Sequence, residues 1–90
     1  MIIAYAESKL RRFGFVINWT KSFRSPFDGH ELKPDTLYAR RNGWIIAVYR
    51  NGDSDSVALI YANRENDPDH SAGSYFKTLP AAIRFATREG

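Results

Sequence analysis

The sequence contains no cysteine and a single methionine in its 90 residues. Without cysteine there can be neither a disulfide framework nor a thiolate metal site, and this composition is typical of the reducing cytoplasm. No apolar run approaches the length of a membrane span, and the opening run Met1 to Ala6 reaches Glu7 before any cleavage site of the signal-peptide type. We therefore predict a cytoplasmic protein, of bacterial or phage origin, that does not contact a membrane.

Motifs for catalysis are also missing. There is no serine or cysteine nucleophile motif and no phosphate-binding glycine loop. His30-Glu31 begins as a zinc-protease motif begins, but the second histidine four residues further on is absent. Asp28, Glu31 and Lys33 are the residue types of a magnesium-dependent nuclease, yet they lie within one short loop and not on two strands. We expect no enzymatic activity, no metal and no cofactor.

The residues that are present suffice for one small domain. A chain of this length buries roughly 60% of its unfolded surface, so the core must be compact and must rely on its six Phe, five Tyr and two Trp. The net charge is +3. Residues 1–50 hold nine Lys and Arg against four Asp and Glu, whereas residues 51–90 hold four against six. This uneven distribution predicts a molecule with a basic side and an acidic side.

Short β-branched and aromatic runs dominate the middle of the chain. The clearest are residues 37–41, 44–50 and 57–63. The turns between them, at 42–43 and 51–55, hold Asn, Gly, Asp and Ser, which tolerate positive φ. Strands joined in order by tight turns predict an antiparallel meander. Residues 15–19 are also β-prone, and residues 74–77 are expected to form a last short strand.

A helix is predicted at each end. Ile3, Ala6, Leu10 and Phe13 recur at helical spacing before Gly14, which predicts a helix over residues 3–13, although a strand over residues 1–5 is an alternative. Thr78 caps a second helix, with Pro80 in its first turn. The inward stripe of this helix comprises Leu79, Ala82, Ile83 and Ala86.

The fold class that follows is α+β. We predict a single domain over residues 1–90, with an N-terminal helix, a three- to four-stranded antiparallel meander and a C-terminal helix packed on the sheet. A long loop is expected at residues 20–36 and an acidic loop at residues 64–74. Both faces of the two central strands are apolar, so the helices must cover both faces or pack side by side, or another chain or a ligand must cover the second face.

Three segments of this pattern resemble a known family. They are Tyr38 to Trp44 with its Arg-Arg-Asn-Gly-Trp sequence, Tyr49-Arg50, and Tyr75 to Thr78 leading into Ala81, Ala82 and Phe85. This order is similar to the three-strand-plus-helix DNA-binding domains of plant ethylene-response factors and of phage integrase arms. The resemblance implies a sheet that enters the major groove with the helix bracing its back. The residues that match the DNA contacts are Arg40, Arg41, Trp44 and Arg50.

The residue types agree with nucleic-acid binding, because Lys and Arg neutralise phosphates and aromatic rings stack on unpaired bases. Tyr49 and Tyr61 would add to the aromatic surface. In the competing interpretation, Trp44 and Tyr61 belong to the core and the arginines only discourage aggregation at a sheet edge. We predict a non-catalytic, DNA-binding domain.

An alternative function is binding of a partner through the acidic residues. A small protein-interaction module could place its acidic loop in a basic channel of a nucleic-acid-handling complex, as an inhibitor or adaptor. Phage-encoded inhibitors of host enzymes, including those of CRISPR defence, are often of this size and style. The partner-binding residues would then be Asp53, Asp55, Glu65, Asp67 and Asp69, together with an apolar face. The state expected is a monomer, or a homodimer formed by pairing of sheet edges.

Overall fold

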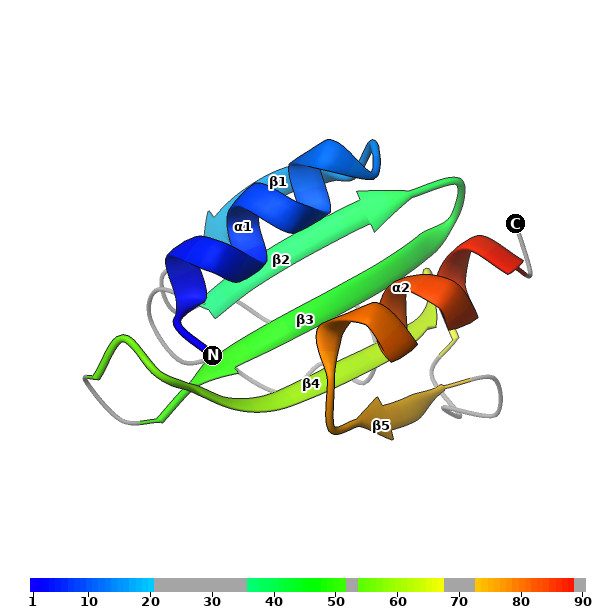
Figure 1. Ribbon diagram of the computed structural model, residues 1–90. Coiled ribbons are helices and arrows are strands. Elements are labelled where there is room, and N and C mark those ends of the chain that lie inside the picture. The colour runs from blue at the N-terminus through cyan, green and yellow to red at the C-terminus, as the bar shows by residue number, and fades with distance from the viewer. Residues whose placement is uncertain (21–35, 52–53, 68–72, 89–90) are drawn as a thin grey trace.

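The computed structural model describes residues 1–20, 36–51, 54–67 and 73–88. The elements are α1 (Ile3–Arg12), β1 (Val16–Thr20), β2 (Thr36–Arg41), β3 (Trp44–Arg50), β4 (Val57–Arg64), β5 (Ser74–Phe76) and α2 (Leu79–Arg88). The strands form one antiparallel sheet in chain order, from β1 to β5 (Figure 1). The predicted α+β class is confirmed. The sheet is larger than expected, because β1 pairs with β2 along its whole length and adds a fifth strand.

Most of the two predicted loops falls on residues 21–35 and 68–72, outside the described part of the chain. The same holds for the residues weighed as zinc or magnesium ligands, between Asp28 and Lys33. At the start of the chain, helix α1 begins at Ile3. Ile2 makes a single antiparallel bridge to Ser56. The N-terminal residues therefore contribute one bridge to the sheet and no further strand.

The Asn-Gly turn between β2 and β3 forms as predicted. Asn42 and Gly43 have φ values of 51° and 81°, and the flanking residues Arg41 and Trp44 pair directly across the hairpin. Positive φ at both central residues matches the right-handed twist of the strands, which is why Asn-Gly is favoured here. The turn fixes the register, and the register decides which side chains of β2 and β3 share a face.

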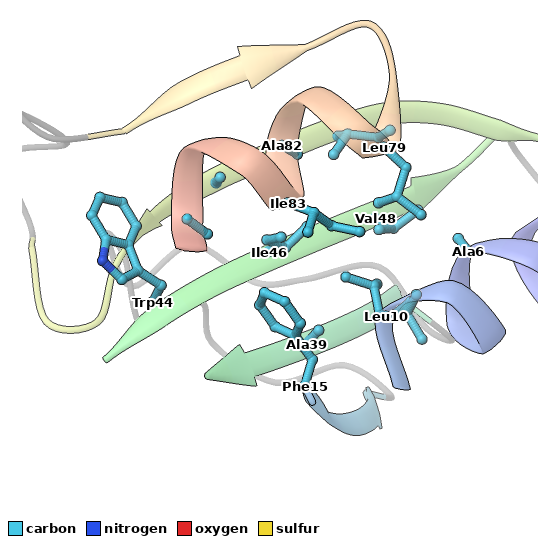
Figure 2. Close-up of a cluster of buried hydrophobic side chains, with 14 of the residues drawn as sticks. Ala6, Leu10, Phe15, Ala39, Trp44, Ile46, Val48, Leu79, Ala82 and Ile83 are labelled. Atoms are coloured by element: carbon cyan, nitrogen blue, oxygen red, sulfur yellow. The ribbon is translucent and has the colours of Figure 1, made fainter. Parts of the chain in front are cut away.

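Both helices lie side by side on one face of the sheet (Figure 1). Ala6 and Leu10 of α1 and Leu79, Ala82 and Ile83 of α2 are buried together with the alternate residues of β3, Trp44, Ile46 and Val48 (Figure 2). The predicted inward stripe of α2 is confirmed. Phe13, expected in the inward stripe of α1, instead follows the last turn as the C-cap and is 48% exposed.

The second face of the sheet carries its own buried cluster. Tyr38, Ile45, Ala47 and Tyr61 come from neighbouring strands, and half-buried Tyr49 packs against them. Tyr75 of β5 extends this row, with its ring centroid 4.6 Å from that of Tyr61. Gly73 lies so close to the row that a Cβ atom there would overlap the Tyr61 hydroxyl and the Asn63 side chain. Both faces of the central strands are thus buried, and the two helices account for one of them.

We expect the substitution Gly43→Ala to lower the free energy of unfolding by about 1 kcal/mol, because an L side chain pays a steric cost at positive φ. Apart from the two chain neighbours of Gly43, no described residue has an atom within 4 Å of the added methyl group, so the loss reports backbone strain. Urea unfolding of the wild type and of the variant measures it. Asn42→Gly is the matched control at the adjacent residue and should retain the wild-type stability to within a few tenths of a kcal/mol. Equal midpoints for Gly43→Ala and the wild type would contradict the turn geometry.

Candidate functional site

The structure does not place on one exposed surface the four residues that match the DNA contacts of the resembling family. Trp44 is 2% exposed and belongs to the core beneath α2. Its ring meets Phe85 edge-on at 5.2 Å, and the guanidinium of Arg64 lies 4.8 Å from its centroid. The indole therefore cannot reach a base in a groove. Its contribution is to the packing of α2 on the sheet.

The three arginines of that set lie at different places. Arg40 is on the second face, where its guanidinium lies 5.4 Å from the Tyr38 ring centroid and 3.7 Å from Glu65. Arg41 is on the helix face, next to Gly14. Arg50 is also on the helix face but about 20 Å from Trp44 along β3, where it lies over the Trp19 ring. These four side chains do not form one contact surface.

The acidic residues predicted to bind a partner are also spread out. Asp53 and Asp69 lie outside the described residues. Asp55 is in the β3–β4 connection, where its carbonyl oxygen accepts a hydrogen bond from the Ile3 N–H. Glu65 and Asp67 follow the other end of β4, about 25 Å away along the strand. Among the described residues, the predicted acidic cluster is therefore divided between the two ends of the sheet.

Glu65 and Asp67 have structural contacts of their own. The backbone N–H of Glu65 donates to the carbonyl of Gly43 at 2.8 Å. The buried Asn63 amide donates to the carbonyl of Asp67 at 3.4 Å, and its Oδ1 accepts from the Arg64 N–H at 2.8 Å. The Glu65 bond ties the chain after β4 to the β2–β3 turn, and the Asn63–Asp67 bond ties it to the end of β4. The Arg40–Glu65 pair is partly exposed and 3.7 Å long, so it adds little to stability.

Basic side chains gather on the helix side of the molecule. In the row of paired residues Arg41, Trp44 and Arg64, the two arginines flank the buried indole. The helices add further cations, and the surface that results, called the basic helix side below, comprises Lys9, Arg12, Arg41, Arg64 and Arg84. Within the described helices, Glu7 is the single carboxylate, and it forms a 2.9 Å ion pair with Arg11. The described acids do not form a matching acidic face, because Asp55 lies near α1 and Glu65 lies beside Arg40 on the second face. The predicted acidic side of the molecule therefore stays a prediction.

A groove runs between the two helices. It has a volume of about 300 Å³ and is lined by Lys9 and Phe13 of the first helix region and by Pro80, Ile83, Arg84 and Thr87 of the second. None of these lining residues is acidic. The Thr87 hydroxyl donates to the Ile83 carbonyl at 2.8 Å. The groove therefore has an apolar floor and two cations at its walls. Sequence patterns did not predict this groove, because its lining residues come from two segments that lie far apart in the chain.

The second face offers no comparable cationic surface among its described residues. Its centre is Tyr38, which is 1% exposed. Burial disfavours the phenolate and raises the pKa of Tyr38 far above the usual value, although the neighbouring Arg40 opposes this shift. Tyr38 therefore stays neutral and packs as a core residue.

Comparison of the chain with protein-family models, with curated protein sequences and with solved structures found no match. Within the described ranges, no group of three or more His, Cys, Asp or Glu residues is arranged to hold a metal ion. No described helix has both the length and the apolar character needed to cross a membrane. The surfaces of this chain are therefore the basis from which its function is inferred.

Stability at alkaline pH should depend on Tyr38. Its folded-state pKa is raised, so its contribution is fully present below the unfolded pKa of about 10 and is lost as the pH rises above that value. In this range each added pH unit should lower the free energy of unfolding by about 1.4 kcal/mol through this one group. Urea unfolding at pH values on both sides of 10 measures the slope. Tyr38→Phe should make the slope shallower, and equal slopes for the two proteins would contradict the assignment.

Proposed function

We propose that this chain is a non-catalytic, cytoplasmic nucleic-acid-binding domain that contacts phosphates through its basic helix side. The observation that supports this best is the gathering of cations from both helices and two strands, with Glu7 as the single carboxylate on the described helices. Arg12, Arg64 and Arg84 are exposed, and Lys9 and Arg41 are half-buried. Exposed cations on one side of a small domain attract a polyanion and release its counterions on binding.

The proposal keeps the function expected from the sequence but moves the contact surface. In the family that the sequence resembles, the sheet enters the major groove, and the helix lies behind it. Here Trp44 is buried beneath α2, and Arg41 and Arg64 flank it on the helix side. The helix side, with the groove between α1 and α2, therefore fits a nucleic acid better than the opposite face of the sheet.

The alternative of an acidic inhibitor or adaptor has less support. The Glu65 carboxylate lies 3.7 Å from Arg40, and Asp55 lies at the other end of β4. A decoy for a basic channel needs several carboxylates on one surface. The described acids do not provide such a surface.

The test is binding of labelled duplex and single-stranded DNA, followed by fluorescence anisotropy at several salt concentrations. We expect affinity to fall steeply with salt. The double variant Lys9→Gln/Arg84→Gln should bind at least tenfold more weakly at low salt. The slope of log K against log salt should become shallower by about 0.7 for each lost contact with a single strand, because fewer counterions are released.

The matched control is Arg11→Gln/Lys77→Gln, which removes the same two charge types at exposed positions outside the groove. Arg11 already pairs with Glu7, and Lys77 follows β5. This control should bind nearly as the wild type does. Equal losses in the two double variants would mean that net charge alone is responsible. Absence of binding at low salt would refute the proposed function.

A further inference from the structure

Helix α1 carries a second stripe that the core does not use. Tyr5, Lys9 and Phe13 are spaced four residues apart, so they lie along one side of the helix. Tyr5 is 51% exposed and Phe13 is 48% exposed. The ammonium of Lys9 lies 5.8 Å from the Tyr5 ring centroid. Two half-exposed aromatic rings thus stand on either side of a cation, about 12 Å apart along the helix axis.

Two residues of this stripe, Lys9 and Phe13, line the groove between the helices, and Tyr5 lies one turn beyond Lys9 along α1. Lys9 and Phe13 form one wall, and Pro80 and Arg84 belong to the other. Ile83, which is 3% exposed, lies at the floor. The groove therefore presents aromatic and apolar surface next to one cation from each helix.

We infer that this groove, together with the adjoining Tyr5 ring, binds single-stranded nucleic acid. Unpaired bases stack on Tyr5 and Phe13, and phosphates lie beside Lys9 and Arg84. The inference rests on the proposed function and names its substrate class. Aromatic rings that alternate with cations are the pattern by which proteins hold single strands, since every base has a stacking face and every nucleotide a phosphate. In a duplex the bases are already stacked on one another inside the double helix, so they cannot stack on the Tyr5 and Phe13 rings.

An acidic amphipathic helix is the other occupant with suitable charge. Helices that bind in grooves are anchored by apolar residues over two turns, at positions i, i+3, i+4 and i+7. The apolar part of this groove is short, because it consists of Phe13, Pro80 and the nearly covered Ile83. The exposed rings and the volume of about 300 Å³ fit nucleotide-sized groups better.

The test is the double variant Tyr5→Leu/Phe13→Leu, which removes both rings and keeps apolar side chains and every charge. The probes are an oligothymidine and a mixed-sequence duplex of equal length, measured at one salt concentration. We expect affinity for the oligothymidine to fall by about tenfold or more, and affinity for the duplex to change less than twofold. Tyr75→Leu is the matched control, because Tyr75 is 64% exposed on β5, away from the groove.

Three results would overturn the inference. Unchanged oligothymidine affinity in the double variant, with the charge variants still impaired, would leave the proposed function standing and remove the stacking site. Equal losses for oligothymidine and duplex would show that the rings act on the fold or on phosphates. Binding of poly-glutamate that is as tight as that of oligothymidine, and is lost in the same variant, would assign the groove to acidic polypeptides. If no nucleic acid binds the wild type, the proposed function fails as well.

A second measurement does not depend on whether the double variant folds. The wild-type protein is irradiated with an oligonucleotide that carries iododeoxyuridine, and the crosslinked peptide is identified by mass spectrometry. Crosslinks at Tyr5 or Phe13 support the inference. Crosslinks at Tyr75, or on the second face of the sheet, contradict it.

Discussion

The burial of β3 on both faces is the constraint on which the rest of the structure depends. Trp44, Ile46 and Val48 lie beneath the helices, while Ile45 and Ala47 belong to the cluster on the opposite face. A strand without a polar face cannot lie at the surface, so it must be central, and two strands flank it on each side. Charged residues are then tolerated only where the strands end. This is why Arg41 and Arg64 lie beside Trp44, at the last position of the helix-covered row.

The position of Trp44 joins the core to the basic helix side. Its ring packs edge-on against Phe85 of α2 and carries the guanidinium of Arg64 on its face. A contact between an exposed cation and an aromatic face contributes about 0.5–1 kcal/mol. The larger consequence is geometric, because the buried ring fixes where Arg64 lies and how α2 sits above it. The surface that we propose to bind phosphates is therefore positioned by a buried core residue.

Local rules predicted the elements well. The Asn42-Gly43 turn, the alternation in β3 and the inward stripe of α2 follow from φ preferences and periodicity, which act over a few residues. The choice of face for the helices does not follow from such rules, because both faces of β3 are equally apolar. Trp44 shows the consequence. A tryptophan among arginines is typical of a nucleic-acid surface, but the packing of α2 above this row makes it a core residue. The exposure of Phe13 was missed because its spacing fits the core stripe, and the helix ends one residue before it.

Some cations of the helices and of the basic helix side can be explained by their positions at helix ends, but others cannot. The last turn of α1 contains Lys9, Arg11 and Arg12, and that of α2 contains Arg88. At these positions positive charge offsets the partial negative charge of the free carbonyls. That effect fades beyond the last turn. Arg84 lies one turn earlier in α2, and Arg41 and Arg64 lie on strands. Stabilisation of helix ends therefore does not account for Arg41, Arg64 and Arg84. We propose that binding of an external polyanion does.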